Sequence, residues 1–186
     1  MKILILSHTR CGSTTLCKWI SKELDIELDE SPHDKITFES TFKKTNIIKK
    51  IVVEEYIPLN EIINKFDKVI CLSRENTIDT SISFIMANNT NIWHDKYMVS
   101  SDWILEHKFE ITNMSHRYDI MKNSLKKING FHITYENMYV NKTDVNRVIS
   151  YLNIENPKHL DTIDYDKKYR KDTHTLTHDF KRKNII

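Results

Sequence analysis

Short apolar runs alternate with amphipathic stretches along most of this chain. Runs of apolar residues lie within 2–7, 50–54 and 68–73, and apolar residues alternate with others at 131–135. Short runs of both kinds are typical of buried strands. Most of the stretches between them repeat apolar residues every three to four positions, as amphipathic helices do. This order of strands and helices predicts an α/β fold.

The expected helices have start and stop signals of their own. Pro58 suits the first turn of a helix, and Asn129-Gly130 suits the end of one. Residues 25–45 are polar and weakly periodic, which predicts a loop with short elements. One helix is expected to carry Leu16, Trp19, Ile20 and Leu24 on its apolar stripe, and others are expected at 58–66, 77–87, 101–128 and 145–152.

Strands that alternate with helices form right-handed β-α-β units. The chain is therefore expected to be a single domain over residues 1–186, with a central, mostly parallel sheet flanked by helices. In such sheets, ligands bind at the carboxyl ends of the strands. The polar residues directly after the strands are thus the first candidates for function.

Composition narrows the classes of protein that fit. A chain of 186 residues with 39% hydrophobic and 29% charged residues fits a globular domain. The net charge is only +2, so an affinity for anions must come from local clusters. Three cysteines without framework spacing suggest reduced thiols. No apolar stretch resembles a signal peptide or a membrane span, and a cytoplasmic location is expected.

The loop after the first strand combines a cation, a glycine and hydroxyl residues. Arg10, Cys11 and Gly12 lead into Ser13, Thr14 and Thr15 at the start of a helix. Backbone N–H groups at a helix N-terminus carry partial positive charge and bind phosphate or sulfate. In the simplest alternative, Ser13 or Thr14 only caps the helix. The loop is not a Walker A loop, and Cys17 stands where a Cys-based phosphatase has its arginine, so Cys11 is expected to be a packing residue.

A second cation follows the strand at 68–73. Arg74 leaves that strand at the edge where Arg10 leaves the first strand. Ser83 lies on the next helix, away from its apolar stripe of Ile78, Ile82, Ile85 and Met86. A guanidinium and a hydroxyl placed in this way can hold one phosphate. The alternative is a surface arginine and an exposed serine.

Together, these loops resemble those of sulfotransferases that use 3′-phosphoadenosine 5′-phosphosulfate (PAPS). The 5′-phosphosulfate loop of that family reads basic, small, glycine, hydroxyl, hydroxyl, as do residues 10–14 here. The family's 3′-phosphate site pairs an arginine with a serine on the next helix, like Arg74 and Ser83. Residues 134–138 resemble its Tyr-Glu-Asp-Leu segment. The chain is most similar to the bacterial branch that includes trehalose sulfotransferases.

The resemblance covers about residues 2–155 and implies roles for particular side chains. It implies a P-loop-like sulfotransferase fold, Glu30 as general base (with Glu39 and His94 as reserves), and Trp93 and His94 beside the acceptor. Glu30 could instead be an ordinary exposed acidic residue, and Tyr135 and Glu136 are expected to be structural. Residues implied to bind the nucleotide are Arg10, Cys11, Gly12, Ser13, Thr14, Thr15, Arg74, Ser83 and, in the basic C-terminal segment 156–186, Arg170.

The expected activity is in-line transfer of a sulfuryl group from PAPS to a hydroxyl acceptor, a small molecule or more specifically a carbohydrate. The adenosine bisphosphate PAP would be the product. No metal is expected, since His174 and His178 lack a third ligand. One alternative is a nucleotide kinase of the ATP type, and another is a non-catalytic protein that binds nucleotides or nucleic acid. No nucleic-acid or membrane partner is expected, and a homo-oligomer is left open.

Overall fold

The computed structural model of this chain describes residues 1–29, 46–51, 62–91 and 99–163. No helix in these ranges is both long and apolar enough to cross a membrane.

The described residues form two compact units. Unit 1 comprises Met1–Glu75 together with Met121–Asp164, and unit 2 includes Asn76–Ile120. The α/β fold and the parallel sheet predicted from the sequence are confirmed, whereas the extent of a single domain over 1–186 stays a prediction.

A parallel sheet forms the centre of unit 1. Within the described residues, neighbouring strands of this sheet are all parallel. Ser7 lies opposite Leu72, and Ser73 lies opposite Thr134, so three strands end together at one edge of the sheet. The strands across the sheet are, in order, β2 (Leu28–Asp29), β3 (Ile47–Ile51), β1 (Ile3–Ser7), β4 (Lys68–Ser73) and β5 (Phe131–Thr134).

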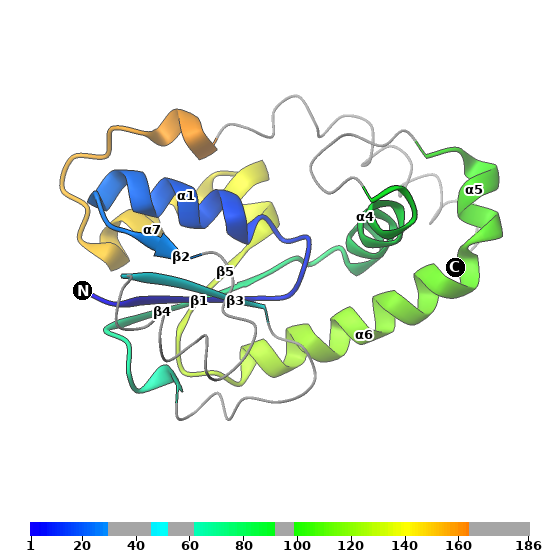
Figure 1. Cartoon of the computed structure of the whole chain (residues 1–186), viewed down its shortest axis with the longest axis horizontal. Coiled ribbons are helices and arrows are strands. Elements are labelled where there is room, and N and C mark those ends of the chain that lie inside the picture. Colours follow the sequence, from blue (N-terminus) through cyan, green and yellow to red (C-terminus); the bar gives the residue numbers. More distant parts are fainter. Residues whose placement is uncertain (30–45, 52–61, 92–98, 164–186) are drawn as a thin grey trace. The chain divides into compact units, whose positions relative to one another are not determined.

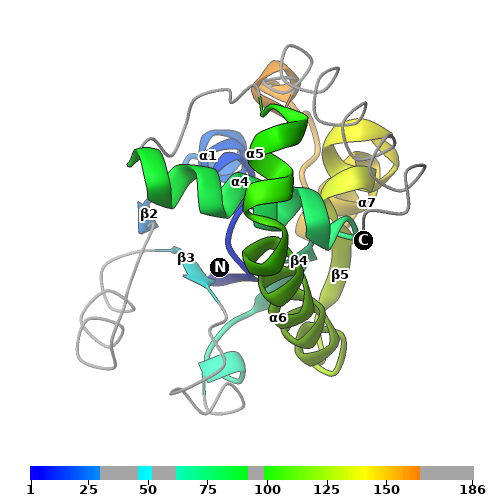
Figure 2. The same ribbon diagram turned by 90° about the vertical axis from the view of Figure 1, so that its right-hand side faces the viewer.

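Three helices make up the described part of unit 2. They are α4 (Thr77–Thr90), α5 (Ser101–Glu106) and the N-terminal part of α6 (Lys108–Lys126), and Figure 2 shows α5 lying across α4. Buried Ile82 and Ile85 of α4 pack with Ile104 and Ile111 of the other two helices. The apolar stripe predicted on the helix after Arg74 is thereby confirmed.

The two faces of β1 pack into different clusters of the unit 1 core. Consecutive side chains of a strand point to opposite faces of its sheet. Ile3 and Ile5 pack with α1 (Ser13–Leu24) and α7 (Thr143–Leu152), which lie on the same side of the sheet in Figure 1. The opposite face packs against Leu125 near the end of α6. Both faces are thus covered, as a parallel sheet requires.

Two predicted elements differ from those observed. The strand expected at 50–54 begins at Ile47 instead, because β3 pairs with β1 from Ile3 onward, and positions 52–54 lie outside the described residues. The helix expected over 101–128 is broken at His107, whose Nδ1 lies 2.8 Å from the carbonyl oxygen of Trp103. The His107 ring thus contacts a carbonyl oxygen in the last turn of α5, which favours the end of the helix there. The strand at Lys68–Ser73 is confirmed in full.

Candidate functional site

Helix α1 begins at Ser13, directly after the first polar loop. Its N-cap is Gly12, which has φ 79° and offers no side chain for capping. The alternative in which Ser13 or Thr14 caps the helix is therefore wrong. Ser13, Thr14 and Thr15 are instead the first three helical residues, whose N–H groups precede the first i to i−4 hydrogen bond. These residues form the positive end of the helix dipole.

Gly12 lies against two aromatic rings from the far side of the sequence. The hydroxyl of Tyr139 donates to the Gly12 carbonyl oxygen at 2.6 Å. A Cβ built on Gly12 would lie 2.6 Å from Cε2 of Tyr139 and 3.3 Å from Cδ2 of Tyr135. Tyr139 belongs to η1 (Glu136–Val140), a π-helical turn that directly follows β5. The loop therefore takes its shape from glycine geometry and from η1 together.

Cys11 points into the core. Its side chain is fully buried, and Sγ lies 2.7 Å from the carbonyl oxygen of His8. Burial raises the pKa of the Cys11 thiol to about 12, against smaller opposing effects that include the charge of Arg74. A thiol held neutral in this way is a poor nucleophile. This agrees with the prediction of a packing residue, and it leaves only the backbone of Cys11 to contact a ligand.

Arg74 follows β4 and is held at both ends by the loop after β1. Its backbone N–H donates to Nε2 of His8 at 3.0 Å. Its guanidinium Nη1 lies 3.4 Å from the carbonyl oxygen of Arg10 and donates to it. The same guanidinium lies over the ring of Tyr135, with 4.5 Å from Cζ to the ring centroid. The two loops predicted to meet at the sheet edge therefore do so, through Arg74 and the backbone of Arg10.

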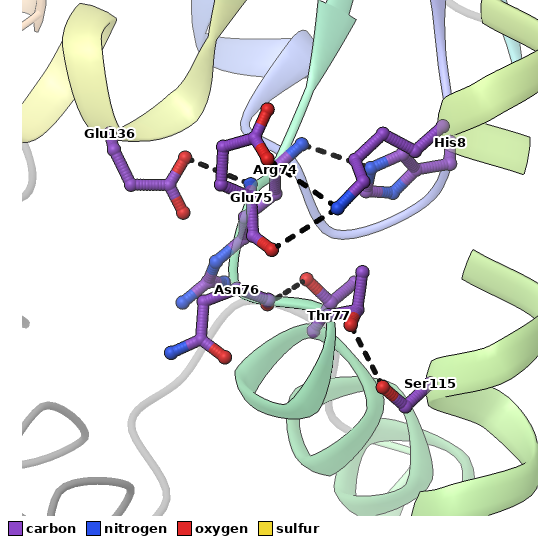
Figure 3. A network of polar contacts seen from close by, with 9 residues as sticks. His8, Arg74, Glu75, Asn76, Thr77, Ser115 and Glu136 are labelled. Atoms are coloured by element: carbon purple, nitrogen blue, oxygen red, sulfur yellow. Dashed lines mark hydrogen bonds and ion pairs between the residues drawn. The ribbon is translucent and has the colours of Figure 1, made fainter. Parts of the chain in front are cut away.

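The peptide after Arg74 is held from the other side. Oε2 of Glu136 accepts the backbone N–H of Glu75 at 3.0 Å, and Nζ of Lys122 lies 3.4 Å from Oε2 of Glu75. Figure 3 shows Glu136 and His8 on opposite sides of the chain at Arg74 and Glu75. Glu136 thus joins neighbouring loops, as predicted for this residue. His8 was not predicted, although a histidine directly after an apolar strand was a usable signal.

Ser83 lies in unit 2, on α4. It is half-buried and lies off the apolar stripe, as the spacing predicts. The N-cap of α4 is Asn76, whose side chain accepts the N–H of Asp79 at 3.2 Å. Close by, the hydroxyl oxygens of Thr77 and Ser115 lie 2.8 Å apart (Figure 3). That Arg74 and Ser83 share one phosphate stays a prediction.

The remaining predicted site residues lie outside the described part of the chain. They are Glu30, Glu39, Trp93, His94 and Arg170. Among the described residues, no group of three or more His, Cys, Asp or Glu side chains is placed to hold a metal ion.

Comparisons with known proteins find similarity in structure only. No protein-family model and no curated protein sequence matches the chain. Among solved structures, it is similar to mouse sulfotransferase SULT7A1, determined in complex with PAP, at a TM-score of 0.55 and 18% identity. That match covers 89% of this chain and 63% of the mouse chain, so this chain spans less than two thirds of the mouse protein.

Two other structures are similar at a lower level. The sulfotransferase domain from the curacin biosynthetic pathway matches at a TM-score of 0.46 and 11% identity, over 83% of this chain and 74% of that one. YorR protein from Bacillus subtilis, in complex with phosphorylated GDP, matches at a TM-score of 0.43 and 13% identity. That match covers 83% of this chain and 99% of the YorR chain. These two values are too low to indicate a shared fold. With the mouse structure, the chain shares the predicted sulfotransferase-like α/β fold.

Proposed function

We propose that this protein is a sulfotransferase that transfers a sulfuryl group from PAPS to a hydroxyl acceptor. The observation that supports it most is the contact between Arg74 and the carbonyl oxygen of Arg10. It joins a cationic strand end to the loop that opens α1, at the sheet edge where α/β proteins bind ligands. PAPS carries anionic groups at both its 5′ and 3′ ends, which fits a site with two cationic loops.

The loop after β1 is assigned to the 5′ end of the nucleotide. The N–H groups at the start of α1 and the guanidinium of Arg10 would hold the sulfonate and the leaving 5′-phosphate. In an in-line transfer, negative charge grows on the leaving oxygen as its bond to sulfur breaks and the acceptor oxygen approaches from the opposite side. Fixed dipoles and a guanidinium stabilise that charge.

Arg74 is assigned to the 3′-phosphate, with Ser83 as its partner. A guanidinium binds a phosphate through paired hydrogen bonds, and stacking on Tyr135 restricts its orientation. Arg170 is proposed as a further contact of the same phosphate.

The acceptor is proposed to be a carbohydrate hydroxyl, as in the trehalose-sulfotransferase branch that the sequence resembles. Glu30 would take the hydroxyl proton, and Trp93 and His94 would border the acceptor. The product left on the protein would be PAP. The three cysteines are buried and form no disulfide with one another, which supports a reducing, cytoplasmic compartment for this reaction.

The direct test is ligand-induced stabilisation followed by turnover. PAP at about 100 times its dissociation constant should raise the free energy of unfolding by about 2.7 kcal/mol. Melting curves with PAP, 5′-AMP and ATP with Mg²⁺ measure this, and labelled PAPS with a panel of sugars then measures transfer. No stabilisation at millimolar PAP contradicts the proposal, and Mg²⁺-dependent ATP turnover would favour a kinase instead.

The 3′-phosphate assignment has its own test in Arg74→Ala. Loss of a paired guanidinium–phosphate contact should weaken the affinity for PAP about thirtyfold. The affinity for 5′-AMP, which lacks the 3′-phosphate, should change little. Calorimetric titration of both ligands measures the difference. Arg117→Ala, which removes an exposed arginine of α6, is the matched control. An equal loss for both ligands would remove Arg74 from the 3′-phosphate site.

A further inference from the structure

His8 is a buried histidine with both ring nitrogens in contact with backbone groups. The residue has no exposed surface. Nε2 accepts the N–H of Arg74 at 3.0 Å, and Nδ1 lies 2.9 Å from the carbonyl oxygen of Thr9. An acceptor nitrogen carries no proton, and the nitrogen facing a carbonyl oxygen must carry one. The contacts therefore define a neutral ring with its proton on Nδ1.

The ring forms one half of a two-point hold on Arg74. His8 fixes the backbone of Arg74, and the carbonyl oxygen of Arg10 receives its guanidinium. The backbone of His8 is itself tied down, since its carbonyl oxygen receives the Cys11 thiol. A shift of the Arg74 peptide would move the base of its side chain and hence the direction of the guanidinium.

We infer that His8 is a positioning residue for nucleotide binding: its neutral ring holds the Arg74 peptide so that the guanidinium is directed to the 3′-phosphate. This inference rests on the proposed function of Arg74. His8 itself touches neither nucleotide nor acceptor. Its contribution to binding is therefore expected to disappear when the side chain of Arg74 is absent.

Protonation would reverse the role of His8. A charged ring has N–H groups at both nitrogens, so Nε2 would face the N–H of Arg74 with a second donor. In the described part of the chain, the charged groups that act on the ring include the guanidinium of Arg74, Lys122 of α6 and Glu136 of η1. Burial lowers the pKa of His8 first, the contact with Thr9 opposes this, the two cations lower it further, and Glu136 raises it. The net direction is down, which keeps the ring neutral near pH 7.

The experiment is a double-mutant cycle on PAP affinity at pH 7.5. His8→Gln keeps an acceptor near the position of Nε2, whereas His8→Phe keeps a ring without an acceptor. Loss of one hydrogen bond predicts PAP binding about five- to tenfold weaker in His8→Phe than in His8→Gln. In the Arg74→Ala background the two variants should bind PAP equally. A histidine that only stabilises the core would give the same ratio in both backgrounds, and that result overturns the inference.

A second arm requires only the wild-type protein and His8→Gln. From pH 7.5 down to the most acidic pH at which both proteins stay folded, the ligand phosphates titrate equally for both proteins. As its ring gains a proton in acid, the wild type should lose more PAP affinity than His8→Gln, which has no ring to protonate. His116→Gln, which replaces an exposed histidine of α6, should show the same pH dependence of PAP affinity as the wild type. Identical pH profiles, or a wild type that gains affinity in acid, would overturn the inference.

The two levels of proposal can be distinguished by the same data. If the wild type binds no PAP at any pH, the sulfotransferase assignment fails, and the inference for His8 falls with it. If the wild type binds PAP but neither arm shows a dependence on His8, only the inference fails. If His8→Phe does not fold, the pH arm decides alone.

Discussion

Gly12 is the residue on which the geometry of the first loop depends most. Its φ of 79° lies in the left-handed region, which glycine adopts at less cost than residues with a side chain. Its missing side chain also leaves room for the rings of Tyr139 and Tyr135. One position therefore meets two separate demands, a backbone conformation and a close approach, and each of them alone favours glycine.

Gly12→Ala should lower the free energy of unfolding by about 2–4 kcal/mol, from backbone strain plus overpacking against Tyr139. The second glycine of the chain gives a matched control. A Cβ on Gly130 would lie 3.1 Å from Sγ of Cys71, and the backbone of Gly130 does not have a positive φ. Gly130→Ala should therefore lower the free energy of unfolding by only about 1 kcal/mol. Urea unfolding of both variants measures the difference. Equal costs would show that the loop tolerates a side chain at position 12.

At this scale the sequence predicted residue types well and contacts poorly. Arg10, Gly12 and Arg74 stand out because a cation or a glycine directly after an apolar strand has few structural reasons to be there. His8 also directly follows an apolar strand, but its contact with Arg74, 66 positions away, has no local signal. The same holds for the contact of Tyr139 with Gly12, 127 positions away. Such pairs can be predicted only once the strand order of the sheet is known.

Among the elements, η1 is the one that connects the strand ends. Its N-cap Tyr135 stacks on Arg74, its first residue Glu136 accepts the N–H of Glu75, and Tyr139 binds Gly12. All three contacts come from one turn after β5. Because π-helical turns are frequent at functional sites, this element fits a role in shaping the candidate site.

Glu136→Ala should lower the free energy of unfolding by about 1 kcal/mol, because the Glu75 N–H loses a charged acceptor in a partly exposed position. Glu136→Gln keeps an acceptor and should cost less. Urea unfolding measures both, with Glu155→Ala as the control at an exposed carboxylate. A larger effect of Gln than of Ala would mean that the Glu136 side chain does not support the Glu75 peptide.

The elements were predictable where local pattern and tertiary pairing agree. β1 and β4 are continuous apolar runs and were expected almost to the residue. β3 begins earlier than expected because its register follows β1, which no local pattern encodes. η1 was not expected, since a five-residue turn has no periodicity to detect.

For the whole molecule, the sequence predicted the fold class but not the division into two units. Alternation of strands and helices implies a parallel sheet, and such a sheet is present in unit 1. The helix expected to run unbroken over 101–128 instead begins as two helices in unit 2, and the second of them continues into unit 1. The boundary between the two units lies inside α6, so no stretch of linker-like composition marks it in the sequence.

Titration of unit 1 should make the stability of the protein depend on pH in two steps. The pKa of His8 is lowered, mainly by burial, so the unfolded chain takes up this proton first and stability falls as the pH drops below about 6.5. For Glu23, burial raises the pKa, but hydrogen bonds from the backbone of Lys158 and His159 and from Trp19 lower it overall. Its stabilisation is present above about pH 4.3 and is lost in more acidic solution.

Urea unfolding at closely spaced pH values between 8 and 3 can separate the two steps. His8→Gln should remove the fall that begins near pH 6.5 and leave the acid step in place, because the glutamine does not titrate. Glu23→Gln should do the reverse, since the amide still accepts the backbone N–H groups of Lys158 and His159 without gaining a proton. A wild-type stability that stays constant from pH 7.5 to 5, or that rises in acid, would mean that the His8 ring is not held neutral. Nε2 of His8 would then carry a proton and could not accept the N–H of Arg74, so His8 could not position the Arg74 peptide.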